Sequence, residues 1–407
     1  MKLSPDSEAI VGATAGVVAE HAEQITSVFY PTMFAAHPEL LNVFNTANQA
    51  VGEQPKALAA SVVAFAVQLL DPNAPDFTPV MRRIAHKHVS LGIKAREYTI
   101  VGRFLLDAVG TVLGAAVTPE VRAAWDEVYW LFATELIAQE AALYALGGTN
   151  PEEPWREYRV VERDEESTDI FSLVIAPVEG HVPTHDTGQY VAISVTLPDG
   201  SRQPRQYTIS SGPRRDSLRV TIKRVHGAAG VPDGIVSNWL YEHARPGAIL
   251  DVSQPAGDVV LDNTEAPLVL VSAGIGITPV AAILEDLSRR QPDRTVRPFH
   301  ADRAHETHAL YTSLRRQVLA MRAARAQNWY EADAHAAPTL HPALPGFMDL
   351  QAVDLPDNAT VFMCGPLPFM QTMRATLLSR GVAAERIHYE VFGPDLWAQN
   401  PDAVGAA

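Results

Sequence analysis

The chain has 407 residues, 47% of them hydrophobic and 19% charged, which is enough for two to four domains with apolar cores. Its 47 acidic and 32 basic side chains give a formal net charge of −15, and this charge disfavours nucleic acid and anionic membranes as partners. The single cysteine, Cys364, excludes an intrachain disulfide, and the first residues lack the basic-then-apolar order of a secretory signal, so we expect a cytoplasmic protein without obligate membrane association.

Residues 1–147 have the pattern of an all-α domain. Apolar residues recur at helical spacing in 57–70 and 121–146, two segments rich in Ala and Leu. Proline fits only the first turn of a helix, so six prolines mark expected helix starts or breaks; they are Pro31, Pro38, Pro72, Pro75, Pro79 and Pro119. Two glycines and two prolines within 147–154 then predict a linker.

Residues 148–264 change to the pattern of an antiparallel β-barrel. Short runs rich in Val, Ile, Tyr and Thr occupy 157–163, 170–175, 190–197 and 218–225. Turn residues separate these runs, as in the Pro-Asp-Gly sequence at 198–200. Short strands with turn signals between them indicate a small barrel.

Residues 265–407 alternate between strand and helix patterns. The expected strands are 268–272, 295–300 and 360–363, and the expected helices are 279–290, 310–325 and 367–380. Strand–helix alternation implies a parallel sheet with helices on both faces. The predicted fold class is therefore multi-domain: an all-α domain, an antiparallel β-barrel domain and an α/β domain with a parallel sheet.

A glycine-rich turn follows the first strand of the α/β segment and opens a helix. It comprises Gly274, Ile275, Gly276, Ile277, Thr278 and Pro279. Glycines let the backbone approach a pyrophosphate closely, and the helix N-terminus favours its negative charge. The motif is weak alone, because its spacing is not GxGxxG and a glycine turn after a strand is often only a turn.

Motifs in the β segment strengthen the nucleotide interpretation. Arg205 offers a guanidinium for bidentate contact with a pyrophosphate, and Tyr207 offers a flat face for a flavin ring. Ser237, after Gly234, opens an expected helix whose first amides could bind phosphate. Taken singly, a surface arginine, an ordinary strand tyrosine and a helix-capping serine explain these residues more simply.

In chain order, these motifs resemble the ferredoxin–NADP reductase superfamily over residues 155–395. The resemblance implies an FAD-binding barrel at 148–264 and an NAD(P)H-binding domain at 265–407. The implied flavin contacts are Tyr190, Arg205, Gln206, Tyr207, Thr208 and Ser237. Cys364 stands where that family has a cysteine near the nicotinamide, although burial as a small side chain is the commoner role of a free cysteine.

The helical domain carries two candidate metal ligands, His86 and His88. A haem iron needs one neutral imidazole on its proximal side, and spacing alone does not choose between the two. A lone histidine on a helix is more often structural. The order of the segments 29–34, 41–45, 52–58, 97–102 and 139–141, with the closing residues 389–394, resembles the flavohemoglobins over residues 1–395.

This second resemblance implies a haem (globin) domain at 1–147 and a role for each matching residue. His88 would be the iron ligand, with Tyr98 and Glu140 in a polar network behind it. Tyr30 would donate a hydrogen bond to O₂, with Gln54 as its distal neighbour. Phe44, Leu58 and Lys87 would contact the haem, and Glu390, Val391, Phe392, Gly393 and Pro394 would contact the flavin. Core packing or a solvated surface would explain each of these residues taken alone.

Three positions depart from the family pattern. Pro55 directly follows Gln54, so the distal helix should begin near it, because proline suits only the first helical turn. Val391 stands where the family commonly has cysteine. Ile277 and Thr278 replace the more usual Gln-Thr after the glycines. None of these departures removes a group that the chemistry requires.

The resemblance implies a nitric oxide dioxygenase that converts NO and O₂ to nitrate with NAD(P)H, FAD and haem b. We expect a monomer with O₂ and NO as its partners. The alternatives are a gas sensor, a reductase of flavins, ferric iron, quinones or hydroperoxides, and a reductase with a haem-free helical domain. Some relatives oxidise D-lactate and have altered flavin motifs, whereas residues 205–210 and 389–394 match here. The sequence leaves open the choice between NADH and NADPH.

Overall fold

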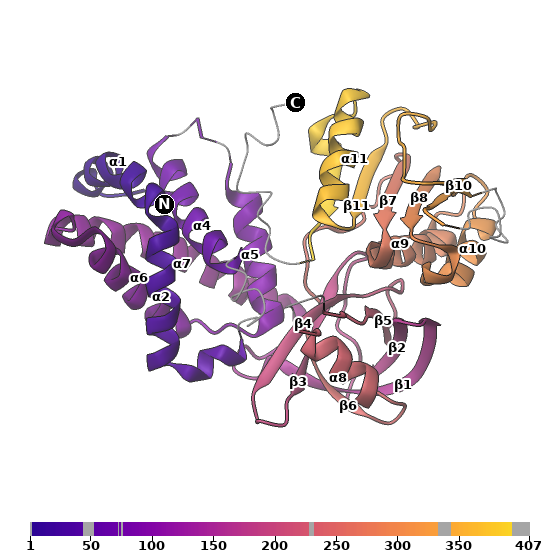
Figure 1. Ribbon diagram of the computed structural model, residues 1–407, viewed down its shortest axis with the longest axis horizontal. Helices are drawn as coiled ribbons and strands as arrows, with labels where there is room; N and C mark the ends of the chain where they lie inside the picture. Colours follow the sequence, from indigo (N-terminus) through magenta and orange to yellow (C-terminus); the bar gives the residue numbers. More distant parts are fainter. Residues whose placement is uncertain are drawn as a thin grey trace. The chain divides into compact units, whose positions relative to one another are not determined.

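The chain forms two compact units, which we describe separately. Unit 1 comprises Met1–Pro154, Thr196–Pro204 and Gly393–Ala407, and unit 2 comprises Trp155–Val195 and Arg205–Phe392. The computed structural model describes residues 2–43, 53–71, 73, 74, 76–227, 232–332 and 343–392, without the side chains of 53–57, 59 and 60 (Figure 1). Unit 2 contains both sheets, so the division into three domains remains a prediction.

Unit 1 is built from α-helices, as the sequence predicts. The described helices are α1 (Pro5–Glu20), α2 (Ala22–Ala36), α4 (Glu53–Leu70), α5 (Thr78–Leu91), α6 (Glu97–Leu113) and α7 (Pro119–Gly147), with 3₁₀ turns η1 (Pro38–Asn42) and η2 (Gly114–Ala116). α4 and α7 contain the two segments with helical spacing. The Thr118 side chain caps α7 by accepting a hydrogen bond from Val121 N, and Gly148 ends the helix with a φ of 60°.

Four of the six prolines marked in the sequence lie in the described residues, and three of these four are in the first turn of a helix. Pro38, Pro79 and Pro119 lie in the first turns of η1, α5 and α7. Pro31 lies inside α2, so the prediction of a helix start or break there is wrong. Its neighbours Phe29 and Tyr30 are buried, and this packing maintains the helix although proline donates no hydrogen bond. Pro72 and Pro75 lie outside the described residues.

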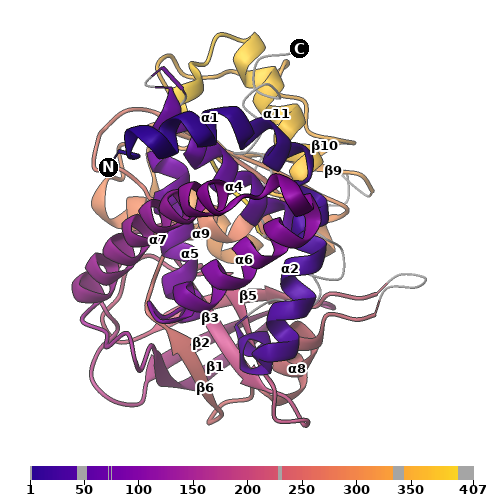
Figure 2. The same ribbon diagram turned by 90° about the vertical axis from the view of Figure 1, so that its left-hand side faces the viewer.

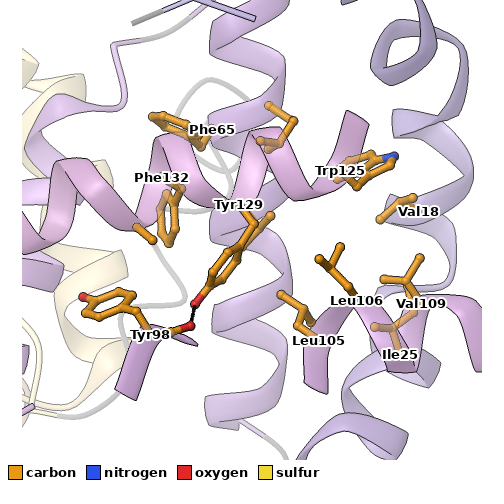
Figure 3. Packing of buried hydrophobic residues seen from close by; sticks show 14 of the residues in the cluster. Val18, Ile25, Phe65, Tyr98, Leu105, Leu106, Val109, Trp125, Tyr129 and Phe132 are labelled. Carbon is orange, nitrogen blue, oxygen red and sulfur yellow. Dashed lines mark hydrogen bonds between the residues drawn. The ribbon is translucent and has the colours of Figure 1, made fainter. Parts of the chain in front are cut away.

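One apolar cluster fills the interior of unit 1. α7, labelled in Figure 2, contacts α1, α4, α5 and α6. Figure 3 shows Phe65 of α4 near Phe132 of α7, with ring centroids 5.3 Å apart, and Tyr129 Oη donating a hydrogen bond to Tyr98 O at 2.5 Å. α6 and η2 together are apolar and long enough to cross a membrane by composition alone. The buried side chains of α6 belong to this cluster, so we interpret it as a core helix.

The first sheet of unit 2 is antiparallel and has six strands. They are β1 (Trp155–Ser167), β2 (Ile170–Pro177), β3 (Tyr190–Thr196), β4 (Arg202–Thr208), β5 (Leu218–Lys223) and β6 (Ile249–Ser253), in the order β4-β3-β6-β1-β2-β5. A bridge between Ile209 and Val220 joins the chain after β4 to the other edge strand, β5, as expected for a barrel. Helix α8 (Ile235–His243) follows β5 and begins after Gly234, as predicted.

The second sheet of unit 2 is parallel. Its strands are β7 (Leu268–Ala273), β8 (Val296–Asp302), β9 (Gln327–Tyr330), β10 (Leu344–Pro345), β11 (Thr360–Cys364) and β12 (Ile387–Glu390), in the order β10-β9-β8-β7-β11-β12. Helices α9 (Ile277–Arg290) and α10 (Tyr311–Ala320) connect strands that progress in one direction, whereas α11 (Leu367–Ser379) connects β11 to β12 in the other. Because such crossovers are right-handed, α11 covers the opposite face (Figure 1), and the strand order reverses between β7 and β11.

His308, which precedes α10, is buried among aromatic rings. Its Nδ1 lies 2.8 Å from Tyr330 Oη, and its ring centroid lies 4.1 Å from that of His300. Burial is the main cause that lowers the pKa of His308 well below 6.5. Burial also lowers the pKa of His185 and of His388. Folding of unit 2 therefore favours the neutral form of all three imidazoles.

We expect unit 2 to lose stability in mild acid. Below about pH 6.5 the unfolded chain takes up protons on these histidines more readily than the folded chain does, so stability decreases from there toward the lowered pKa values, by at most about 1.4 kcal/mol per pH unit for each histidine. His308→Gln, which keeps a partner for Tyr330, should reduce this decrease in urea unfolding curves recorded between about pH 7.5 and 5.5. His181→Gln is the control, because the His181 side chain is 66% exposed. Equal acid sensitivity in both variants would contradict the prediction.

Candidate functional site

Three helices of unit 1 bring His88, Tyr98 and Glu140 together. His88 lies near the end of α5, Tyr98 in the first turn of α6, and Glu140 in the second half of α7. His88 Nδ1 is 2.8 Å from Tyr98 Oη and 2.8 Å from Glu140 Oε1, and Tyr98 Oη donates to Glu140 Oε1 at 2.5 Å. Tyr98 is 6% exposed and Glu140 is 4% exposed, so water does not compete for these hydrogen bonds.

The carboxylate determines the state of the imidazole. Burial and the nearby Glu140 raise the pKa of Tyr98, so this hydroxyl stays protonated and donates to Glu140. Glu140 Oε1 can then accept the Nδ1 proton of His88, which leaves the lone pair on Nε2. An imidazole in this state is a metal ligand. The contact with Glu140 favours His88 as the candidate ligand, a choice that residue spacing alone does not make.

The protein groups around His88 fit a haem better than a bare metal ion. In the ranges that the structure describes, no three His, Cys, Asp or Glu side chains gather to hold a metal. A metal on His88 Nε2 would therefore take its other ligands from a bound group. A porphyrin iron with a proximal histidine and a carboxylate behind it meets this requirement.

Tyr30 and Leu58 lie in the same apolar cluster as Tyr98. Tyr30 of α2 is 5% exposed, and its ring packs edge-on against Phe29 with centroids 4.6 Å apart. Burial raises the pKa of the Tyr30 hydroxyl, which therefore remains a hydrogen-bond donor. Leu58 is partly buried against the cluster. Tyr30 thus offers a buried hydroxyl donor among apolar side chains.

The other expected haem-side residues are less fully described. α4 begins at Glu53, which confirms that Pro55 lies in the first turn of this helix. Gln54 is the residue before it, but its side chain lies outside the described residues, as does Phe44 entirely. Lys87 is partly buried in α5, next to His88.

In unit 2 the glycine turn touches the chain after β11. Gly274–Gly276 form a 3₁₀ turn (η3) between β7 and α9, and Ile277, Thr278 and Pro279 are the first residues of that helix. A Cβ on Gly276 would overlap the carbonyl oxygen of Cys364 and lie 2.8 Å from Gly365 N. The two turns thus meet where the strand order reverses, outside the carboxyl ends of β7 and β11. In open α/β sheets this is where nucleotides bind, and the N-terminus of α9 adds a favourable partial charge for phosphate.

β3 and β4 carry the residues expected to contact the flavin. Arg205, Gln206, Tyr207 and Thr208 form the second half of β4, and Tyr190 begins β3. Burial lowers the pKa of the Arg205 guanidinium, which is the environment in which a bound anion compensates a desolvated cation. Burial raises the pKa of Tyr207, so its hydroxyl stays neutral. These properties fit a pyrophosphate and a flat aromatic ring.

Ser237 and the residues after β11 have definite partners of their own. The Ser237 hydroxyl accepts from Val225 N at 3.1 Å and donates to Gly234 O at 3.2 Å, which joins the start of α8 to the chain after β5. Glu390 is paired in register with Cys364, whose pKa is raised by burial and by Glu390. Val391 and Phe392 follow, with Phe392 half exposed, and Gly393 and Pro394 lie outside the described residues.

The sequence reasoning missed Arg219 and Glu285. Glu285 Oε2 accepts a hydrogen bond from Arg219 Nη2 at 3.4 Å, and Glu285 is 5% exposed. The available signal was the Glu285-Asp286 pair within a helix segment that is otherwise mostly apolar, since charged side chains are rarely buried without partners.

Comparisons with known proteins agree with both units. The family model described as Globin matches residues 27–136, and the one described as Oxidoreductase NAD-binding domain matches residues 270–375. The Flavohemoprotein of Bordetella parapertussis is 41% identical over 402 residues, covering 96% of this chain and 98% of that protein. The Flavohemoprotein of Halalkalibacterium halodurans is 39% identical over 407 residues, covering 96% and 97%.

Two solved structures show the same likeness. The flavohemoglobin from Malassezia yamatoensis with bound FAD and heme is 34% identical with a TM-score of 0.87, covering 97% of this chain and 100% of that one. The FAD/NAD binding domain of nitric oxide dioxygenase from Vibrio cholerae is 33% identical with a TM-score of 0.54, covering 59% of this chain and 99% of that one. The three-part fold class predicted from the sequence is thereby confirmed.

Proposed function

The chain belongs to the flavohemoprotein family, and from this premise we propose that it is a nitric oxide dioxygenase, which converts NO and O₂ to nitrate with NADH or NADPH as the electron donor. The observation that carries the proposal is the contact of His88 Nδ1 with the buried Glu140 carboxylate. Such a carboxylate makes a proximal imidazole more electron-donating, which favours O₂ activation over O₂ storage. The same chain also supplies a reductase fold to deliver electrons.

We propose the following residues as the binding groups of each cofactor. His88 Nε2 would hold the haem iron, and Phe44, Leu58 and Lys87 would contact the haem. FAD would be held by Tyr190, Arg205, Gln206, Tyr207, Thr208, Ser237, Glu390, Val391, Phe392, Gly393 and Pro394. Residues 274–279 would hold the phosphates of NAD(P)H. When bound, the three groups supply the redox chemistry, in which a flavin divides a two-electron donation into one-electron steps.

The protein's own groups perform the remaining tasks. Tyr30, buried and protonated, would donate a hydrogen bond to the O₂ substrate. We propose Gln54, in the first turn of α4, as its distal neighbour. Glu140 and Tyr98 hold the His88 ring in one orientation and keep the proton on Nδ1. The apolar cluster around Tyr30 and Leu58 excludes water. We propose a cytoplasmic monomer without obligate membrane association, and the net charge of −15 supports the last point because it disfavours anionic membranes.

The decisive experiment measures NO consumption by the protein loaded with haem and FAD. Air-saturated buffer is used with and without NADH or NADPH, and nitrate is assayed as the product. Fast loss of NO that depends on the nucleotide, with stoichiometric nitrate, supports the proposal. If NADH reduces the haem while NO persists, the dioxygenase assignment is wrong, and a gas sensor or another reductase takes its place.

We expect Tyr30→Phe to release O₂ faster and to consume NO more slowly. The variant keeps the aromatic ring of Tyr30 but removes the buried hydroxyl, and a hydrogen bond of this kind stabilises a polarised ligand by about 1.5–3 kcal/mol, or roughly tenfold to hundredfold in the dissociation rate. Stopped-flow displacement of O₂ by CO gives the rate. Tyr129→Phe, which removes the hydrogen bond to Tyr98 O, is the matched control. An unchanged O₂ off-rate in Tyr30→Phe refutes the distal role.

We expect Glu140→Gln to weaken haem binding and the iron–histidine bond. Glutamine keeps the size of the side chain but loses the negative charge that polarises His88, and loss of such a partner lowers metal affinity by about 10–100-fold. Haem transfer to apomyoglobin measures the affinity, and resonance Raman spectra of the ferrous protein measure the iron–histidine stretch, which should shift to lower frequency. Glu135→Gln on the same helix is the control. Identical frequencies in the two variants would contradict the role of Glu140.

A further inference from the structure

Two adjacent buried acids of α9 reach across to the first sheet of unit 2. Glu285 is 5% exposed and Asp286 is 4% exposed. Glu285 Oε1 accepts from Arg214 Nη2 at 2.6 Å, and Glu285 Oε2 accepts from Arg219 Nη2 at 3.4 Å. Asp286 Oδ2 accepts from Thr187 Oγ1 at 2.6 Å. Helix α9, which begins at the glycine turn, is therefore joined by side chains to the part of the chain that carries the flavin motif.

Arg219 links Glu285 directly to the end of that motif. Besides its contact with Glu285, Arg219 donates from Nη2 to Ser210 O at 2.5 Å and from Nε to Ser210 Oγ at 3.3 Å. Ser210 Oγ in turn lies 2.8 Å from Thr221 Oγ1 of β5. Ser210 is the second residue after β4, whose residues 205–208 are the proposed flavin contacts. The Arg219 guanidinium thus contacts both Ser210, next to the proposed flavin residues, and Glu285 of α9, the helix that begins at the glycine turn.

The backbone at this junction is closely packed. A Cβ on Gly212 would overlap Arg289 Nη2 and would lie 3.2 Å from Asp286 N and 3.3 Å from Asp286 Cα. The loop after Ser210 therefore lies against the backbone of α9. A helix is a stiff rod over this length, so a shift of Glu285 along its axis moves the glycine turn at its start by the same amount.

Burying the charges of Glu285 and Arg219 costs desolvation free energy, so their contact calls for a reason other than stability. A buried ion pair is offset by large desolvation penalties, and apolar side chains of similar volume often stabilise a fold as well or better. By contrast, the ion pair of Arg322 with Asp293 in unit 2 has side chains that are 78% and 66% exposed, so it pays little desolvation penalty. Charged hydrogen bonds are directional, so the buried contacts fix an orientation that apolar packing would leave less defined.

We propose that Arg219 and Glu285 are positioning residues, which fix helix α9 and its glycine turn against residues 205–210 and so set the rate at which a bound nucleotide reduces a bound flavin. This inference rests on the proposed function, because it assumes that NAD(P)H and FAD bind at these two motifs. Hydride transfer requires reacting atoms about 3–3.5 Å apart, and a misplacement of about 1 Å costs about a hundredfold in rate. A contact outside the site can therefore control the step without touching either ligand.

The test compares flavin reduction in Glu285→Gln and Arg219→Lys with the wild-type holoprotein. Anaerobic stopped-flow mixing with NADH, and with NADH deuterated at the transferred position, isolates this step. We expect each variant to be about 10–100-fold slower, with a changed deuterium isotope effect, a weaker long-wavelength charge-transfer band and normal FAD content. Asp293→Asn, at the exposed pair, is the matched control and should behave as wild type. Wild-type rates and isotope effects in both variants overturn the inference.

A double variant separates positioning from stability. Arg219→Met with Glu285→Leu replaces the pair by apolar side chains of similar length and should be more thermally stable than either single charge-removing variant, Arg219→Met or Glu285→Leu. We expect this variant to remain slow in flavin reduction, and a wild-type rate in it refutes the positioning role. If neither NADH nor NADPH reduces the wild-type flavin, the proposed function itself is wrong, and the inference about the rate of reduction falls with it. Where reduction does occur, hydrogen exchange of the backbone amides of 210–212 and 214 tests the restraint itself: faster exchange in Glu285→Gln than in Asp293→Asn supports the inference, and equal exchange overturns it.

Discussion

Replacing His88 with alanine is expected to give a protein that folds, retains FAD and lacks haem. The imidazole is the one group that we assign to the iron, and Glu140 and Tyr98 hold it in place through Nδ1. Without it, the Soret band should fall to a small fraction of the wild-type absorbance, and NO consumption should fall with it. Reduction of FAD by NADH should persist, because the residues proposed to bind FAD and NAD(P)H all lie after position 189 of the sequence, and His88 is not among them.

His86→Ala is the matched control for this experiment. His86 lies two residues earlier on α5, and the sequence offers it as an equal candidate. The pyridine haemochrome assay gives the haem content of both variants, and added imidazole should restore a Soret band to His88→Ala by occupying the vacated position. If His86→Ala loses its haem while His88→Ala retains it, the assignment of the ligand is wrong.

A single methyl group at Gly276 is expected to disable the reductase half. The added Cβ would overlap the carbonyl oxygen of Cys364 and approach Gly365 N to 2.8 Å. These are backbone atoms at the end of a central strand, so they cannot rotate away as a side chain would. We expect Gly276→Ala to lower the free energy of unfolding of unit 2 by about 3 kcal/mol. Separation of the two turns should also slow NADH oxidation at least about tenfold.

Gly274→Ala, in the same turn, is the comparison for the effect on stability. Gly274 has a φ of 53°, and no atom lies within 4 Å of the position of its Cβ. Alanine there meets only the left-handed backbone preference, which costs about 1–2 kcal/mol. Urea unfolding followed by flavin fluorescence compares the stability of the two variants, and NADH-dependent ferricyanide reduction measures the rate in Gly276→Ala. An equal loss of unfolding free energy in the two variants would show that the contact with the Cys364 turn is unimportant.

The elements that the sequence predicts are those whose side chains repeat regularly. α4, α7, β7 and α9 have helical or continuous apolar patterns, and their local composition is sufficient to identify them. β4 is different, because Arg202–Thr208 contains two arginines, two glutamines and a proline. It becomes a strand through pairing with β3, and such pairing depends on a partner rather than on composition. The short strands β6, β9, β10 and β12 escaped prediction for the same reason.

Some contacts of the candidate site could be expected from the sequence, whereas others appear only in the folded structure. The resemblance identified Tyr98 and Glu140 as partners of His88, and the structure brings all three together. Residue spacing alone could not choose His88 over His86, because the carboxylate that distinguishes it lies 52 residues further along the chain. Arg219 and Glu285 are 66 residues apart and belong to no motif. Their contact exists only once helix α9 has packed against β5 of the first sheet, so it is a property of the tertiary structure.

The burial of Cys364 should protect its thiol from modification by products of nitric oxide, the proposed substrate. Oxidation products of nitric oxide that donate a nitrosonium group form S-nitrosothiols with accessible thiolates, and thiolate is the reactive form. Cys364 is the only cysteine of the chain, it is 1% exposed, and its pKa is raised well above that of a free thiol. The carbonyl of the same residue supports the glycine turn, so a modified side chain would distort the nucleotide site. The single thiol of the chain is therefore kept protonated and inaccessible to nitrosating agents.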